Sequence, residues 1–222
     1  MRKQTFAVAV VVVVAFMSSF VSSAKAVVLF NNWGPNNTYN GNTGWTVNIG
    51  AALQAHLEQA SVFTVTGGDY FLNTVDLAVG HLFGPNVLFV RLHADDNNKP
   101  GAVIAQTVVV DQMQPLPSDP KVNHPPVVAT FPGATLLEGG TNYWISLDVD
   151  TSVTDAWLAW NYNITNDRAL RADRTDGGPW VTYPQFPEPR GTMRINATPV
   201  PEPTGVVLFA AVGMALARRR SR

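Results

Sequence analysis

Few residues of this chain have the type and spacing that catalysis requires. Its 222 residues include four His and no Cys, which excludes a thiol nucleophile and a zinc site built from thiolates. The sequence also contains no Gly-x-Ser-x-Gly elbow, no Walker loop and no His-Glu-x-x-His pair. A metal triad would require the fold to gather His81, His93 and His124, and His56-Leu57-Glu58 stands alone. We therefore expect turn or surface histidines.

Paired carboxylates are the remaining route to hydrolysis. A glycosidase places two carboxylates about 5–10 Å apart across a cleft. Between the two ends of the chain the only glutamates are Glu58, Glu138 and Glu188, two of which stand beside Gly or Pro in turn-like contexts. We predict that the protein is not an enzyme, and a secreted glycan-processing enzyme remains an alternative, because a pair among the acids cannot be recognised from the sequence.

Oxygen-rich turns are the best candidates for binding a small ion. Asp95-Asp96-Asn97-Asn98 places four oxygen-bearing side chains in one turn, and Ca²⁺ prefers oxygen ligands. Asp95, Asp96 and Asn98 are therefore candidate calcium ligands, and Ca²⁺ is the one possible cofactor. A second acidic cluster spans 148–155. Asp and Asn also populate turns because they hydrogen-bond locally, so an ordinary turn is the alternative at both places.

Several aromatic residues stand in polar segments where a flat ring could stack on a sugar. The candidates are Trp144, Trp160 and Trp180. Alternation places Trp144 opposite Tyr143 and Ile145, so its ring is expected to face outward. The alternative is a sandwich with both faces partly covered, in which these rings pack beneath loops.

Charges of opposite sign are interleaved over residues 167–176. Three Arg and three Asp cancel there, which favours a solvated, charge-balanced segment over an anion-binding site. The residues are Asp167, Arg168, Arg171, Asp173, Arg174 and Asp176.

The middle of the chain has the periodicity of β-strands. Apolar and polar residues alternate with period two, and Gly- and Pro-rich turns separate the runs. This pattern predicts an all-β fold, an antiparallel β-sandwich that is jelly-roll-like, with one short helix over 51–60. The expected strands are Val27–Phe30, Trp45–Ile49, Ser61–Val65, Leu72–Val79, Val87–His93, Ala102–Val110, Val127–Phe131, Asn142–Val149, Ala156–Asn161 and Met193–Asn196.

The N-terminus has the three parts of a secretory signal peptide. Met1-Arg2-Lys3 is basic, residues 6–20 are apolar, and Ala24-Lys25-Ala26 is a small-x-small cleavage site. The apolar run is shorter than the roughly 20 residues that span a membrane. We expect residues 1–26 to form a signal helix that signal peptidase removes, with Ala24 and Ala26 fixing the cleavage position.

The C-terminus combines an extended motif, a short apolar segment and a basic end. Pro201-Glu202-Pro203 precedes the uncharged residues 205–217, and Arg218, Arg219 and Arg220 follow. A transmembrane helix of this length falls short of the hydrocarbon core, and the arginines favour the cytoplasmic side.

Residues 199–222 resemble the PEP-CTERM sorting signal of bacterial exported proteins. The resemblance implies export, transient retention in the inner membrane and recognition near Pro201-Glu202-Pro203 by an exosortase. An ordinary tail anchor is the alternative. The signal describes a route and carries no information on the chemistry of the domain that it delivers.

Residues 27–198 form the exported domain. They hold eight Lys and Arg against fifteen Asp and Glu, a net charge of about −7, which disfavours nucleic acid as a partner. From about 61 to 161 the sequence is similar to the choice-of-anchor type of bacterial surface domain, of the R variety. The similarity rests on Phe63-Thr64-Val65, on residues 94–101 and on residues 140–147 followed by Trp157.

Together these features predict an exported, non-catalytic protein of the cell envelope or extracellular matrix with a structural or adhesive role. A lectin-like module that binds polysaccharide is the alternative from the binding class. The expected partners are signal peptidase, exosortase, the inner membrane transiently and a polysaccharide.

Overall fold

A computed structural model describes residues 25–50, 53–183 and 189–201. Over these ranges the chain is built almost wholly of β-strands and contains no α-helix, only the short 3-10 turn η2 (Pro35–Asn37), so the all-β prediction is confirmed. No helix within them has the length and apolar character needed to cross a membrane. The predicted signal and C-terminal helices fall in 1–24 and 202–222, outside the described residues.

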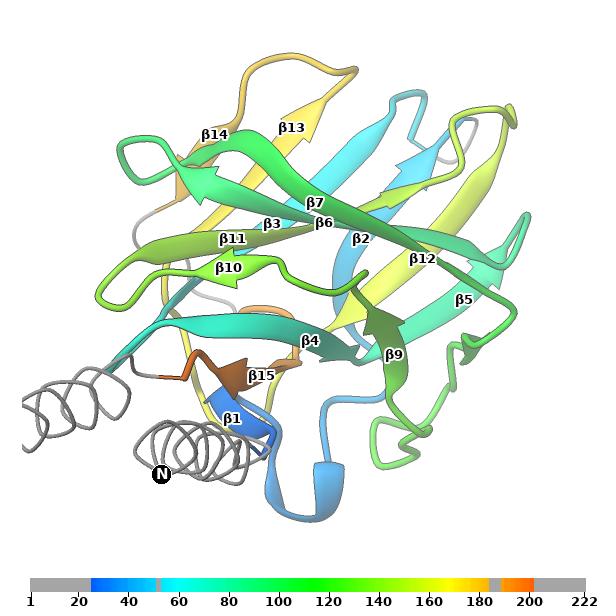
Figure 1. Cartoon of the computed structure of the whole chain (residues 1–222). Coiled ribbons are helices and arrows are strands. Elements are labelled where there is room, and N and C mark those ends of the chain that lie inside the picture. Colours follow the sequence, from blue (N-terminus) through cyan, green and yellow to red (C-terminus); the bar gives the residue numbers. More distant parts are fainter. Residues whose placement is uncertain (1–24, 51–52, 184–188, 202–222) are drawn as a thin grey trace, which may run out of the picture.

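The smaller sheet joins the two ends of the domain (Figure 1). Its central strand pairs on one side with β15, which in turn pairs with β1, and on the other side with both β9 and β10. All of these pairs are antiparallel. The strands are β1 (Val27–Asn31), β15 (Met193–Pro199), the central β4 (Tyr70–Leu77), β9 (Val127–Thr130) and β10 (Leu136–Leu137).

The larger sheet branches at its centre. Its order is β7-β6-β11-β3-β2-β12-β5-β8, and β3 also pairs with β13, which pairs with β14. Pairing is antiparallel except between β5 and β8. The strands are β2 (Gly44–Ile49), β3 (Leu57–Thr64), β5 (Val79–Phe83), β6 (Val87–Asp95), β7 (Pro100–Val110), β8 (Gln114–Pro115), β11 (Asn142–Val149), β12 (Ala156–Asn161), β13 (Arg171–Thr175) and β14 (Val181–Tyr183).

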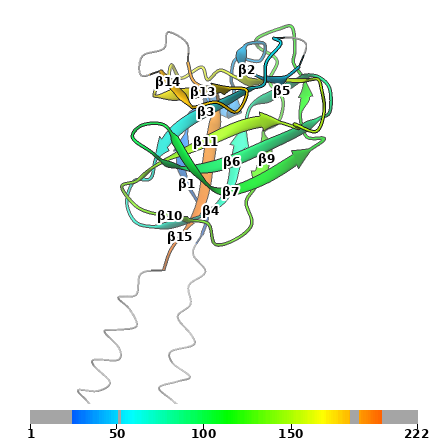
Figure 2. The same ribbon diagram turned by 90° about the horizontal axis from the view of Figure 1, so that it is seen from above.

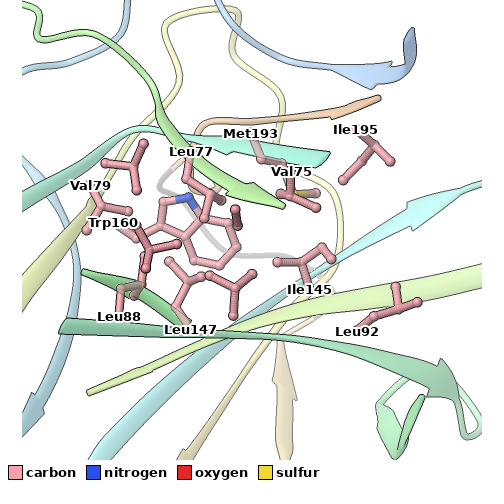
Figure 3. Close-up of a cluster of buried hydrophobic side chains, with 14 of the residues drawn as sticks. Val75, Leu77, Val79, Leu88, Leu92, Ile145, Leu147, Trp160, Met193 and Ile195 are labelled. Atoms are coloured by element: carbon pink, nitrogen blue, oxygen red, sulfur yellow. The ribbon is translucent and has the colours of Figure 1, made fainter. Parts of the chain in front are cut away.

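One apolar core lies between the two sheets. Alternating residues of both sheets point into it, as the period-two pattern requires, and Figure 3 shows Trp160 among Leu77, Leu88 and Leu147. The opposite face of the larger sheet, formed by β6, β11, β3 and β13, points away from this core. We call it the outer face, and it carries the polar side chains described below.

Most expected strands are present, but the predicted helix over 51–60 is wrong for its second half. Leu57–Ala60 begin β3. Two neighbouring polar residues are buried at this point: Glu58 forms an ion pair, and Gln59 donates to the Thr46 carbonyl. Because they point to opposite faces of the strand, the sequence shows no alternation of apolar and polar residues there.

The prediction of a solvated segment over 167–176 is wrong for its middle, although Arg168 and Asp176 are exposed as expected. Residues 171–175 form β13, in which Arg171 is buried and Arg174 binds Glu58. Guanidinium groups are tolerated inside a fold when carboxylates neutralise them and aromatic rings cover them, and Arg171 stacks on both Trp45 and Tyr183.

Candidate functional site

The outer face of the larger sheet gathers a group of buried and half-buried ionisable side chains that could do chemistry. By alternation Glu58 on β3, Arg91 on β6, Asp148 on β11 and Arg174 on β13 all point to this face, and His56 joins them from the turn before β3. We call these five residues the ion-pair cluster. Four strands that are far apart in sequence therefore contribute to one group of contacts.

Arginines hold both carboxylates of the ion-pair cluster. Arg174 binds Glu58 through two nitrogens, with Nε–Oε1 at 2.6 Å and Nη2–Oε2 at 2.8 Å. Arg91 Nη1 bridges the acids, at 3.1 Å from Glu58 Oε2 and 2.9 Å from Asp148 Oδ2. The other oxygen of Asp148 lies 2.6 Å from His56 Nε2. Every carboxylate oxygen thus has a nitrogen partner.

His56, Glu58 and Asp148 have the composition of a metal site. One ligand atom from each lies within 4.8 Å of the others, and His with two carboxylates suits a divalent transition metal. The two guanidinium groups already balance the two carboxylates, however, and they occupy the lone pairs that a cation would need. A metal could bind only by displacing Arg91 or Arg174, so the donor set fits an ion-pair network better than a metal.

Glu58 and Asp148 are also the pair of close carboxylates that the sequence could not reveal. They are only 1% and 2% exposed, and a glycosidase needs its acid and its nucleophile open to a sugar. The geometry therefore favours an internal network that joins four strands over an acid–base pair acting on substrate.

His93 and Ser146 form a second polar contact on the same face. His93 Nδ1 lies 3.0 Å from the Gly101 carbonyl and Nε2 lies 2.8 Å from Ser146 Oγ. A carbonyl only accepts, so Nδ1 carries the proton, and the neutral ring accepts from the Ser146 hydroxyl. Burial lowers the pKa of His93, and the nearby Arg174 and Arg91 charges act in the same direction.

A serine hydroxyl that donates to a neutral imidazole is also the arrangement of a nucleophile–base pair. Here, however, both side chains are buried away from any substrate. Ser146 is 0% and His93 is 1% exposed. The Trp180 ring lies edge-on to His93 at 5.8 Å between centroids, and Arg174 stacks on Trp180 at 4.7 Å. The contact serves to satisfy buried polar groups.

The predicted sugar-stacking residues have three different environments. Trp144 faces outward, as alternation predicted, yet it is fully buried against Ala60 and Ala172, and its Nε1 donates to Asp95 Oδ1 at 2.7 Å. Trp160 is fully buried in the core. Both are therefore wrong as stacking candidates, because a sugar needs an open ring face.

Trp180 is the one of the three that reaches the surface, where it is half-buried. One side of its ring is taken by the Arg174 guanidinium. Any stacking on a sugar would therefore use the remaining side or the ring edge.

The predicted calcium ligands make hydrogen bonds and an ion pair within their own turn, and Asp95 also binds Trp144 of β11. Asp95 accepts from Trp144 and from the Asn98 backbone N–H at 3.2 Å. Asp96 accepts from the Asn97 amide at 3.0 Å and lies 3.7 Å from Lys99 Nζ. In the second acidic cluster, Asp148 belongs to the ion-pair cluster. These contacts correspond to the turn alternative.

The other histidines do not form the metal triad considered from the sequence. His81 Nε2 contacts the Gly84 carbonyl at 2.9 Å and His124 Nε2 contacts the Pro115 carbonyl at 3.1 Å, whereas His93 lies on the outer face. Each imidazole has its own local partner.

The two predicted processing segments leave the domain at one end. β1 and β15 are antiparallel, with Val27 opposite Ala197, so the start of the first strand adjoins the end of the last. Ala26 is exposed immediately before β1. The Val200 N–H still donates to the Asp69 carbonyl at 2.9 Å, and Pro201 follows exposed. Ala24, Glu202, Pro203, Arg218, Arg219 and Arg220 lie outside the described residues.

Comparison of the chain with models of known protein families and with curated proteins finds no match to either.

The ion-pair cluster was missed from the sequence for an identifiable reason. The strands expected at 87–93 and 142–149 already placed Arg91 and Asp148 at positions opposite to the apolar ones. Glu58 was not assigned to the same face, because it lay inside the expected helix. Strand alternation extended back to His56 would have put His56 and Glu58 on one face.

Proposed function

We propose that this chain is an exported, non-catalytic protein of the cell envelope or extracellular matrix, sorted by an exosortase. The observation that supports the proposal is the order of Pro201-Glu202-Pro203, an apolar segment and arginines. The motif starts one residue after Val200, whose N–H still donates to the Asp69 carbonyl of the domain. The domain itself, on this proposal, is a jelly-roll sandwich of the choice-of-anchor R type with a structural or adhesive role.

The proposed route has two cuts at the same end of the domain. Signal peptidase cuts after Ala26, the C-terminal helix holds the protein in the inner membrane, and exosortase then acts near Pro201-Glu202-Pro203. Because β1 and β15 pair along one edge, both cuts fall just outside the same pair of strands. Neither cut removes a residue of the core.

The outer face supports a non-catalytic role. Glu58 and Asp148 are neutralised by Arg91 and Arg174, and the hydroxyl of Ser146 is buried. Groups held in this way stabilise strand packing and are poorly placed to meet a substrate.

Replacing Pro201, Glu202 and Pro203 with alanine tests the sorting step in the native host. Wild-type protein is expected to lose its C-terminal segment and to leave the membrane fraction. The triple variant is expected to keep that segment and remain with the membrane. Thr204→Ala, next to the motif, is the matched control and should behave like wild type. Unchanged processing of the triple variant would refute the sorting claim.

A lectin-like role is the second candidate, and the half-buried Trp180 is the observation that favours it. A glycan array probed with the exported protein should give hits that Trp180→Ala removes. Trp157→Ala, a half-buried tryptophan on β12 that packs on Phe83, is the control and should keep them. An array without hits for wild type would exclude this role for the glycans tested.

A further inference from the structure

The outermost strand of the larger sheet has a free edge. β7 runs from Pro100 to Val110 and is the longest strand among the described residues, and its only strand partner there is β6. Figure 2 shows β7 beyond β6 at the margin of the sheet. No strand of the described ranges pairs with its second edge, and the backbone N–H and C=O groups along such an edge template the addition of another strand.

The part of β7 nearest Val110 has the regularity that such an addition needs. Ala105–Val110 pair residue by residue with Leu92–Val87, whereas the register shifts at His93 and again before Asp95. Bulges of this kind protect an edge against pairing. They are confined to residues 100–104 and leave six regular residues unprotected.

The side chains of this segment also favour association. No ionisable residue occurs between Lys99 and Asp111, and 105–110 reads Ala-Gln-Thr-Val-Val-Val. Uncharged, β-branched segments without Pro or Gly pair readily with their own kind. Val108 is 43% and Val110 is 55% exposed, on the face that also carries Phe89 opposite Val108.

The lack of charge along β7 favours a second copy of this chain as the occupant of the edge. The domain carries about −7, so two copies repel each other over most of their surface and can approach along an uncharged margin. Because the edge is uncharged, its partner strand does not need to carry charge. It is also self-complementary, because a two-fold axis through an antiparallel pair brings the same strand of each copy together.

We propose that β7 is an interaction surface for a second copy of this chain, through antiparallel pairing of Gln106–Val110 with the same residues of the second copy. The axis is perpendicular to the sheet, so outward side chains meet outward side chains. Val108 then lies opposite Val108 of the second copy, with the two Cβ atoms about 5 Å apart. The pairing closes on itself and gives a dimer.

Cysteine crosslinking tests the pairing directly, because the chain contains no Cys. The full chain carrying Val108→Cys, exported by its host, should give a crosslinked homodimer with a short thiol crosslinker. Ile164→Cys, at a similarly exposed loop position, is the control and should give none. Equal crosslinking at both positions, no dimer at Val108, or a crosslink to a different protein would each overturn the proposal.

Sedimentation velocity of the exported protein provides the second measurement. Val108→Lys places two like charges opposite each other and should weaken dimerisation at least about 10-fold. Val181→Lys is the matched control, since Val181 is 49% exposed on β14, a strand that pairs with β13 and not with β7, and should dimerise like wild type. A monomeric wild-type protein, or equal dimerisation by both variants, would contradict the proposal.

Discussion

Five of the six arginines between residues 27 and 198 pack against aromatic rings of the fold, and Arg168 is exposed. Five guanidinium groups lie 4.4–6.0 Å from the centroid of an aromatic ring, a distance at which cation and ring attract. Arg91, Arg174, Arg190 and Arg194 also bind a carboxylate. Burial lowers the pKa of Arg190, and the Asp167 carboxylate beside it acts in the opposite direction. The five are Arg91, Arg171, Arg174, Arg190 and Arg194.

Glu58 is the residue on which the ion-pair cluster depends most. Glu58→Gln keeps the shape of the side chain but leaves two guanidinium groups facing one remaining carboxylate, so we expect a loss of about 3–5 kcal/mol in the free energy of unfolding. Chemical denaturation measures it. The control is Asp96→Asn, whose ion pair with Lys99 is exposed and should contribute less than about 1 kcal/mol. Equal effects of the two changes would contradict the assignment.

His93 should make stability fall with decreasing pH. Its pKa in the folded protein is lowered from 6.5, so below about pH 6.5 the unfolded chain binds a proton that the folded protein does not. The free energy of unfolding therefore declines from pH 6.5 down to the pKa of the folded state. Chemical denaturation at several pH values between 5 and 8 should show this dependence of the free energy of unfolding on pH.

The variant His93→Gln separates this effect from other titrations. The slope between pH 5 and 6.5 should be smaller in His93→Gln than in wild type. Val122→Ala, which changes an exposed side chain that does not titrate, should keep the wild-type slope. The same slope in all three proteins would exclude His93 as the cause.

At the scale of elements, alternation identified the strands whose inner residues are all apolar. Asn142–Val149 and Ala156–Asn161 match β11 and β12 at both ends. β13 and the start of β3 were missed because Arg171, Gln59 and Glu58 occupy buried positions. Their burial depends on partners from other strands, and the sequence does not state which strands pair.

The contact between β12 and the segment before β15 gives a prediction for packing. A Cβ on Gly191 would lie 2.4 Å from atoms of the Trp160 ring, whereas one on Gly133 would meet nothing within 4 Å. Because Trp160 is fully buried and cannot move aside, Gly191→Ala should cost about 1–3 kcal/mol of stability.

Thermal or chemical unfolding of Gly191→Ala beside Gly133→Ala measures that cost. The Gly133 variant should differ from wild type by less than about 0.5 kcal/mol. Two variants of equal stability would mean that the Trp160 ring does not pack on this backbone.

At the scale of the whole molecule, the sequence predicted the class of fold but not the division into two unequal sheets. Pairing of β1 with β15 brings the two predicted processing segments to one end, and the free β7 edge lies in the other sheet. A protein held at that end would leave β7 free to meet a second copy. The proposed export route and the proposed dimer are thus geometrically compatible.

Mass spectrometry of the terminal peptides of the protein recovered from its native host tests the export account most directly. The account predicts an N-terminus at Val27 and the absence of any peptide containing Arg218, Arg219 or Arg220. A recovered protein that begins at Met1, or one that still carries the arginines, would contradict it.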